Sequence, residues 1–230
     1  MKNVVVCEKC GAENPVYRLT CKECNSFLRD RVNNIDFWKT FWKIFESPDK
    51  AFFTIIYAKN KNMVVLLIIL AGIKTALVSL QIKTMITSAN FGIDWLTFIL
   101  SGMVFAVLLL VGYAYLITRL NKIFGLETRF KDNLAIYTYA FVPLIITLFL
   151  LLPVEFALFG EYWYLANPLS AEINPAAAHI LLFIETVMLL WSFVLLITAN
   201  YVQTKNTFYS VIVSLILCLI LFGAPAIIYG

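Results

Sequence analysis

Charged residues and histidine are scarce in this sequence. Asp, Glu, Lys and Arg make up 14% of the 230 residues, against about 25% in soluble domains, and the one histidine, His179, ends an apolar run. The sequence also lacks the H-E-x-x-H and G-x-S-x-G patterns and a pair of aspartates within an apolar run, so it offers no evident nucleophile or water activator. These absences argue against a soluble domain and against an enzyme.

An apolar leader is also absent from the N-terminus. The first ~35 residues are polar, whereas a secretory signal would place an apolar segment and a small-residue cleavage site there. We therefore expect the N-terminal region to stay in the cytosol.

Apolar residues dominate the rest of the chain and form 61% of the whole. Five continuous runs of about 20 residues are each long enough for a helix to cross a hydrocarbon core of about 30 Å. They lack the alternation of barrel strands, and a lipid-spanning helix satisfies its own backbone. The sequence predicts an all-α integral membrane protein with a five-helix transmembrane bundle in residues 63–230. The runs are Met63–Ile82, Trp95–Thr118, Leu134–Leu152, His179–Thr198 and Phe208–Tyr229.

Basic residues are distributed very unevenly between the runs. The segments that would face one side of the membrane hold 16 Lys and Arg residues, and those that would face the other hold one, Lys83. Because basic residues favour the cytosolic side, the N-terminus is predicted inside and the C-terminus outside, in the cell membrane. The segment 153–178, which has no Lys or Arg, is then an external loop, either a lid or part of an aromatic belt.

A linker, residues 31–62, precedes the first run and is rich in aromatic residues. Phe37, Trp38, Phe41, Trp42 and Phe45 recur at helical spacing, so we expect an amphipathic helix in the headgroup plane, with Trp38 and Trp42 as interfacial residues. A second short helix is expected at Pro48–Tyr57, because Ser47 suits an N-cap and proline suits a first turn. One bent amphipathic helix is the alternative.

Four cysteines form two C-x2-C pairs within residues 1–30, separated by ten residues: Cys7, Cys10, Cys21 and Cys24. Two such turns aim four sulfur atoms at one ion, which is typical of a structural zinc site with a closed coordination shell. We predict a zinc ribbon that holds one zinc ion, is folded largely by the metal, and has a short strand at Val16–Leu19. An iron site and disulfide bonds are the alternatives. Cys218, in the fifth run, is interpreted as an ordinary buried residue.

Two charged residues lie inside the apolar runs, Lys74 in the first and Glu185 in the fourth. Counted at ~1.5 Å per residue, they lie about 2 and 5 Å to the outer side of their run centres. Because each is costly in lipid, we predict that they form an ion pair or hydrogen bond. Its role is either a structural tie between two spans or a polar lining for ion or proton passage.

Small residues and a proline also have predicted structural roles in the runs. Gly72 and Ala76, four residues apart, permit a close approach of another helix. Pro143, at the centre of the third run, is predicted to kink that helix.

Several phrases in the chain resemble the Yip1 domain family. They are "ESPDKAF" before the first run, "LNKIFGLETRFKDNLAIYTYAFVPLIITLFLLL" at residues 120–152 and "LLWSFVLLITANYVQTKNTFYSVIVSL" joining the last two runs. The resemblance covers about Phe37 to Gly230 and implies five spans with a cytosolic N-terminus. In eukaryotes it implies membrane traffic with Rab-type GTPases as partners. The Asp-Leu-Tyr-Gly-Pro element of that branch is absent, so the ribbon-plus-bundle layout looks more like the bacterial and archaeal members.

The favoured function is a non-enzymatic membrane adaptor or membrane-organising protein. Its ribbon, which exposes charges of both signs, would bind an unknown cytosolic protein, while the bundle contacts the lipid bilayer. Nucleic acid is not an expected partner, and self-association into a homo-oligomer is left open. The alternative is a transporter or channel with a midplane site around Lys74, Glu185 and the helix kinked at Pro143.

Overall fold

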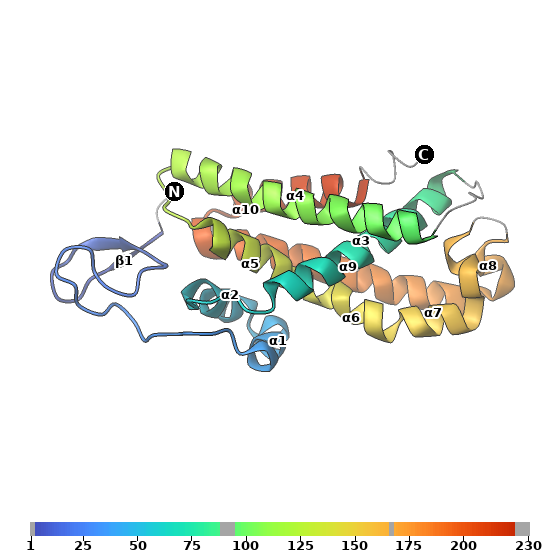
Figure 1. Ribbon diagram of the computed structural model, residues 1–230, viewed down its shortest axis with the longest axis horizontal. Helices are drawn as coiled ribbons and strands as arrows, with labels where there is room; N and C mark the ends of the chain where they lie inside the picture. Colours follow the sequence, from blue (N-terminus) through green and yellow to red (C-terminus); the bar gives the residue numbers. More distant parts are fainter. Residues whose placement is uncertain (1–2, 88–94, 166–167, 224–230) are drawn as a thin grey trace. The chain divides into compact units, whose positions relative to one another are not determined.

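The computed structural model describes residues 3–87, 95–165 and 168–223, and the chain is mostly helical (Figure 1). Two short strands, β1 (Val4–Val6) and β2 (Glu13–Pro15), pair antiparallel at the front of the chain. The α-helices follow: α1 (Phe37–Glu46), α2 (Pro48–Tyr57), α3 (Val64–Thr87), α4 (Trp95–Ile123), α5 (Phe130–Ala140), α6 (Val142–Leu150), α7 (Leu152–Phe159), α8 (Ser170–Ile173), α9 (Pro175–Thr204) and α10 (Thr207–Cys218). Two short helical turns, η1 (Gly160–Tyr164) and η2 (Leu219–Gly223), complete the elements.

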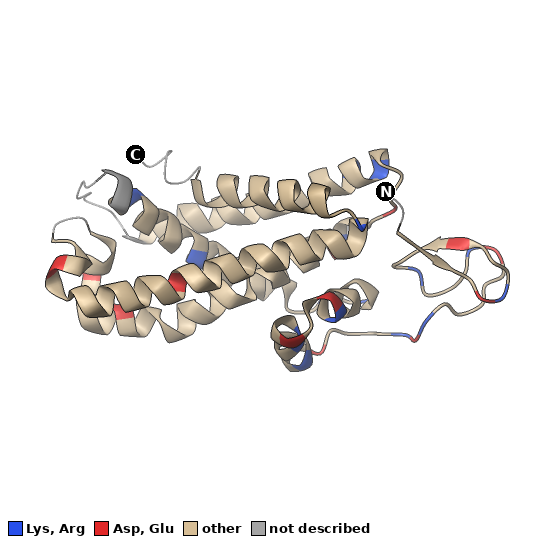
Figure 2. Cartoon of the chain, turned by 180° about the vertical axis from the view of Figure 1, so that it is seen from behind, with Lys and Arg blue, Asp and Glu red and all other residues tan. Residues whose placement is uncertain are grey.

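Four helical stretches are long and apolar enough to cross a membrane. They are Val64–Thr84, Leu96–Ile123, Val142–Tyr164 and Pro175–Thr204, and a shorter apolar stretch is Thr207–Gly223. Figure 2 shows that charged residues gather in the cysteine-containing region and the short helices and are sparse along the long helices. A membrane interior selects this pattern, because a charged side chain in hydrocarbon costs several kcal/mol.

The chain divides into two compact units. Unit 1 comprises Met1–Val65, Leu110–Ala140 and Leu195–Ser214, and unit 2 comprises Leu66–Leu109, Phe141–Val194 and Leu215–Gly230. Helices α4 and α9 contribute residues to both units.

In unit 1, two short helices separate the cysteine region from the first long helix. The side chain of Asp36 caps α1 by accepting a hydrogen bond from Lys39 N at 3.0 Å. Helix α2 begins at Pro48, as the sequence predicts, so the linker holds two helices and not one bent helix. Its apolar side chains, including Phe52 and Ile55, are fully buried, and α2 packs against α1 and α5.

Unit 2 has an apolar core of aromatic and aliphatic side chains, among them Leu80, Phe159, Trp163 and Tyr164. Helices α3 and α4 approach closely within this unit. A Cβ placed on Gly102 would lie 2.5 Å from the Cβ of Ala76, and one placed on Gly72 would lie 3.1 Å from the carbonyl oxygen of Met103. The small residues at 72 and 76 therefore face an α4 backbone that has no room for a larger side chain at 102.

Two predicted elements were wrong, the third apolar run and a strand of the cysteine-containing region. The third apolar stretch is not Leu134–Leu152: the helix is interrupted at Phe141, and the long apolar stretch runs over Val142–Tyr164. Most of the expected external loop 153–178 is consequently helical, at residues 153–164, 170–173 and 175–178. The expected strand at Val16–Leu19 is absent from the described chain, where the strands are β1 and β2. The fifth run, predicted to Tyr229, is helical to Gly223, and its last residues lie outside the described part.

Candidate functional site

The four cysteines of the two C-x2-C pairs form one cluster. The Sγ atoms of Cys7 and Cys24 are 3.6 Å apart, those of Cys10 and Cys21 are 3.5 Å apart, and all four lie within 4.8 Å of one another. A tetrahedral zinc site with Zn–S bonds of about 2.3 Å has sulfur–sulfur distances of about 3.8 Å. The cluster thus fits a four-thiolate metal site, and all five cysteines of the chain are free thiols.

Two matching turns give the cluster its geometry. After each C-x2-C pair the next residue is left-handed, Gly11 with φ +72° and Asn25 with φ +57°. Their backbone N–H groups donate to the carbonyls of Cys7 at 2.8 Å and Cys21 at 3.2 Å, which closes each turn. Glycine and asparagine are the residues that adopt this conformation most readily, so the two turns are locally encoded.

Hydrogen bonds surround the sulfur atoms. The Ser26 hydroxyl lies 3.1 Å from Cys7 Sγ, and this contact lowers the pKa of Cys7. The backbone N–H of Cys24 is the main cause that lowers the pKa of Cys21 to about 6. For Cys10, the backbone N–H of Ala12 favours the thiolate, but the adjacent cysteine sulfurs outweigh it and raise the pKa to about 12. The hydrogen bonds to Cys7 and Cys21 thus favour their thiolates, the form in which cysteine binds a metal ion.

The cysteine-containing region, residues 3–30, here called the ribbon, contacts the end of helix α9 within unit 1. The side-chain amide of Asn3 donates to the carbonyls of Val202 at 2.7 Å and Gln203 at 2.8 Å. These carbonyls belong to the last turn of α9, where a helix leaves backbone acceptors without internal partners. The ribbon therefore caps this helix.

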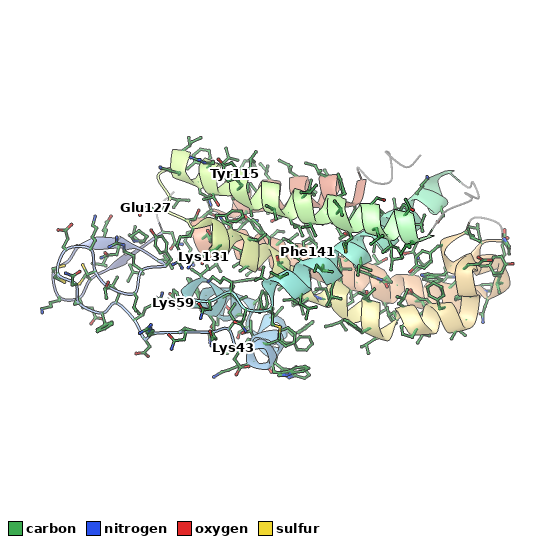
Figure 3. The ribbon with its side chains drawn as sticks, in the orientation of Figure 1. Lys43, Lys59, Tyr115, Glu127, Lys131 and Phe141 are labelled. Atoms are coloured by element: carbon green, nitrogen blue, oxygen red, sulfur yellow. The ribbon has the colours of Figure 1, made fainter. Side chains whose placement is uncertain are left out.

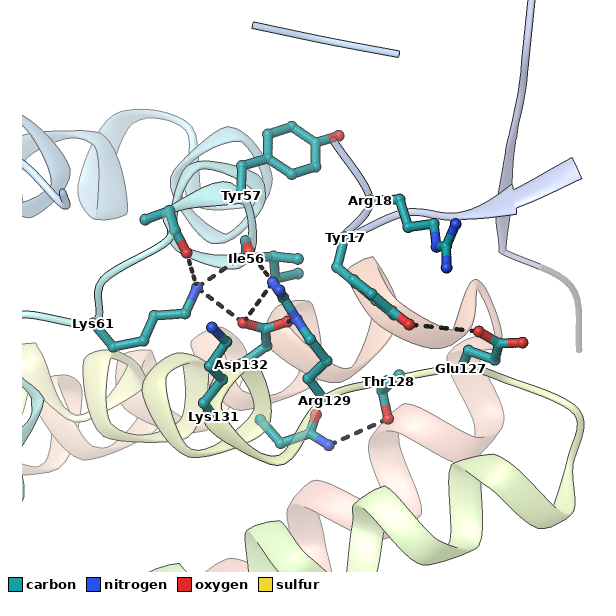
Figure 4. Close-up of polar contacts among 12 residues, drawn as sticks. Tyr17, Arg18, Ile56, Tyr57, Lys61, Glu127, Thr128, Arg129, Lys131 and Asp132 are labelled. Carbon is teal, nitrogen blue, oxygen red and sulfur yellow. Dashed lines mark hydrogen bonds and ion pairs between the residues drawn. The ribbon is translucent and has the colours of Figure 1, made fainter. Parts of the chain in front are cut away.

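Aromatic and arginine side chains make a second contact between the ribbon and the helices of unit 1. The guanidinium of Arg29 lies 4.2 Å from the ring centroid of Tyr57 on α2, and that of Arg129 lies 4.4 Å from the ring of Tyr17 in the ribbon. The Tyr17 hydroxyl is 3.5 Å from Glu127 (Figure 4). The ribbon and the helical part of unit 1 thus each supply one arginine and one tyrosine, and these cation–π contacts fix the ribbon on the helices.

A buried aspartate, Asp132 on α5, lies next to this contact (Figure 4). It accepts two hydrogen bonds from Arg129, at 2.6 and 3.1 Å, and forms an ion pair with Lys61 at 2.9 Å. Lys61 also donates to the carbonyls of Ile56 and Ala58. Burial lowers the pKa of Lys61, and the charge of Asp132 opposes that shift. The cluster ties the start of α5 to the end of α2.

A buried polar network continues within unit 1. The Tyr137 hydroxyl donates to the side chain of Asn200 at 2.7 Å, and the Asn200 amide donates to Ser214 at 3.0 Å. The Tyr113 hydroxyl donates to the carbonyl of Val213. These bonds join α5, α9, α10 and α4, and they satisfy polar groups that would otherwise be costly in an apolar interior.

Unit 2 holds a second buried charge cluster. Lys74 on α3 donates to Glu185 on α9, and the Thr147 hydroxyl of α6 lies 3.2 Å from the other Glu185 oxygen. Glu155 on α7 is fully buried and lies within electrostatic reach of Lys74, Glu185 and Tyr164. Its two oxygens have no hydrogen-bond partner among the described residues. Lys74 is thus paired with Glu185, and a second buried carboxyl group, that of Glu155, lies near this pair.

The other residues singled out from the sequence lie as follows. Trp38 and Trp42 are exposed on α1, in a chain of aromatic contacts that includes Phe41. Pro143 lies in the first turn of α6, directly after the interruption at Phe141. The chain therefore has two helices where the sequence predicts one kinked span.

Three polar residues of these clusters were missed in the sequence. Asn200 and Asp132 lie at or beyond the edges of predicted runs, and Glu155 falls in the expected external loop. The sequence could have indicated that Glu155 lies in a helix. The apolar pattern continues through Leu151 and Leu152 past Pro153, and proline is well tolerated in the first turn of a helix.

Comparison with known proteins gives one family. The family model of the Yip1 domain matches residues 42–225, which is most of the chain and all of the long apolar helices. No curated protein and no solved structure gives a significant match.

Proposed function

The chain belongs to the Yip1 domain family of multi-pass membrane proteins, and from this premise we propose that it is a non-enzymatic adaptor whose zinc-folded ribbon binds a cytosolic protein. Members of the family are generally non-catalytic membrane proteins, which agrees with the absence of a catalytic motif. The four cysteines would hold one structural zinc ion, because four thiolates leave no open position for substrate.

One observation carries the proposal: the ribbon exposes apolar side chains although it is already docked. Phe27 is 76% exposed, and Val6, on β1, is 57% exposed. Exposed aromatic residues on a rigid element are frequent anchors of protein interfaces. Because the ribbon is held by the contacts of Asn3 and Arg29, a partner would not have to immobilise it, which lowers the entropic cost of binding.

The proposed topology has five spans with the ribbon in the cytosol, at the cell membrane. The four long apolar helices and the shorter stretch Thr207–Gly223 provide the spans, and the asymmetry of basic residues supports the orientation. Trypsin added to sealed right-side-out vesicles should leave the ribbon intact, whereas inside-out vesicles should lose it at Arg29 or Arg31. Cleavage from the outside would contradict the orientation.

A photo-crosslinking residue at position 27 tests partner binding directly. We expect it to capture a defined protein in cells, and we expect Phe27→Ser to abolish co-purification of that protein. Ile123, which is 77% exposed outside the ribbon, is the matched position for both the crosslinker and a serine control. The same capture from position 123, or no capture from position 27, would contradict the proposal. Capture of a second copy of the chain would show self-association in place of a separate partner.

The second candidate, a transporter or channel, is favoured by one observation, the buried charge cluster of unit 2. Lys74 pairs with Glu185, Glu155 lies within electrostatic reach of both, and such a cluster of ionisable groups suits a proton or small cation. Ion or proton flux in reconstituted vesicles, lost in Glu185→Gln, would support this function. Its absence in the wild-type protein would leave the cluster a structural tie.

A further inference from the structure

A basic pocket lies in unit 1 where the ribbon and the segment after it meet the end of α2. Its volume is about 380 Å³. Five of its lining residues are cationic, and among the described residues no carboxylate lines it: the cations are Arg18, Arg29, Arg31, Lys59 and Arg129. Tyr17 and Tyr57 supply aromatic walls. Figure 4 shows Arg18, Tyr17 and Arg129 on neighbouring elements of this region. Figure 3 shows Lys59 of the pocket close to Lys131.

The positive charge of this pocket is largely uncompensated. Within the described residues, Arg18, Arg31 and Lys59 make no ion pair. Arg29 donates only to backbone carbonyls, such as that of Tyr17 at 2.9 Å. Burial lowers the pKa of Arg29 and the nearby charge of Arg129 lowers it further, while Tyr57 and Asp132 oppose this shift. Cations that repel one another in a shared hollow are stabilised by an anion.

Two arginines of the basic pocket are held in place before any ligand arrives. Arg129 is fixed by Asp132, by the carbonyl of Ile56 at 3.1 Å and by the Tyr17 ring. Arg29 is fixed over the Tyr57 ring. Rigid guanidinium groups lose little freedom when they bind an anion, so such an arrangement is preorganised.

We propose that the basic pocket binds a phosphate monoester, carried either by a lipid headgroup or by a soluble compound. A phosphate monoester carries about two negative charges and several strong acceptor oxygens at neutral pH. Arginine forks match phosphate oxygens in a bidentate manner, and three of the five cations are arginines that are only partly exposed. The volume suits a phosphorylated sugar-sized group and exceeds what a simple halide needs.

Calorimetric titration of the full-length, zinc-containing protein tests the proposal. The protein is placed in phosphatidylcholine nanodiscs, and the probes are inorganic phosphate, inositol bisphosphate and a short-chain phosphatidylinositol monophosphate. We expect saturable binding of at least one phosphate monoester that weakens as salt is raised. Binding of the soluble inositol compound as tightly as the lipid would show that the pocket recognises the phosphorylated headgroup without its acyl chains, and preference for the lipid would identify a membrane ligand.

A matched pair of double variants separates the basic pocket from general surface charge. Arg31 and Lys59 are exposed pocket residues whose side chains form no hydrogen bond or ion pair among the described residues, and Lys39 and Lys50 are exposed on α1 and α2 outside the pocket. We expect R31Q/K59Q to weaken binding about tenfold and K39Q/K50Q to change it less than about twofold. Equal losses in both variants, or no saturable binding of any probe by the wild-type protein, would overturn the proposal.

Discussion

Asp132→Asn is the substitution whose consequence can be worked out most fully. The buried carboxylate of Asp132 neutralises both Lys61 and Arg129, and asparagine keeps its shape while removing its charge. Lys61 would then be a buried cation with only uncharged oxygen atoms for partners. We expect a large loss of stability that depends mainly on Lys61.

The magnitude follows from the contacts. At 2.9 Å, the attraction between Lys61 and Asp132 amounts to about 6 kcal/mol at an effective dielectric constant of about 20, before the cost of desolvation. Removing one partner of a buried pair typically costs about 3–5 kcal/mol. In Asp132→Asn, Lys61 keeps its hydrogen bonds to the carbonyls of Ile56 and Ala58, and Arg129, which is 30% exposed, can contact water. We therefore expect the substitution to lower the free energy of unfolding by about 3 kcal/mol, the lower end of that range.

Equilibrium unfolding in mixed micelles, followed by tryptophan fluorescence, measures the effect in a double-mutant cycle. Lys61→Met removes the stranded cation, so Asp132→Asn should cost only about 1 kcal/mol in the Lys61→Met background, against about 3 kcal/mol in the wild-type protein. The coupling free energy should be about 2 kcal/mol. A loss below ~1 kcal/mol for Asp132→Asn, or additive losses in the double variant, would refute the reasoning.

Three further outcomes follow. Gly102→Ala should lower the free energy of unfolding by about 1–3 kcal/mol in the same assay, because its Cβ would meet Ala76. Gly112→Ala, on the same helix but with open space around it, should not lower it. Equal effects of the two substitutions would contradict the close approach of α3 and α4. Lys74→Met should lower the free energy of unfolding by about 3 kcal/mol, and adding Glu185→Gln should recover part of that loss. A double variant without any recovery would show that the two side chains do not interact energetically. A strong chelator should remove one zinc ion per chain, measured by elemental analysis, and make the ribbon sensitive to protease; an intact ribbon without metal would contradict metal-driven folding.

The sequence predicts the cysteine cluster well because its determinants are local. All four sulfur ligands lie within 18 residues of chain, and each turn closes through a hydrogen bond between near neighbours. The start of α2 at Pro48 is predictable for the same reason, since a helix start depends on residues adjacent in the chain.

Features that depend on distant parts of the chain were not predictable. Asp132 looks like an ordinary acidic residue in a first helical turn, and only the fold shows that Lys61, 71 positions earlier, lies beside it. The third apolar run was misplaced because continuous hydrophobicity does not reveal the interruption at Phe141. That error hid Glu155, which seemed to lie in a loop outside the bilayer.

The cap that Asn3 provides for the last turn of α9 has a consequence for biosynthesis. Its acceptors, Val202 and Gln203, are about 200 positions further along the chain and emerge from the ribosome only after most of the protein has been made. The ribbon can form its contacts with Tyr57 and Arg129 earlier, but its cap on α9 forms only after the fourth long helix is complete. Formation of this cap therefore marks the point at which the chain has been made as far as the end of α9.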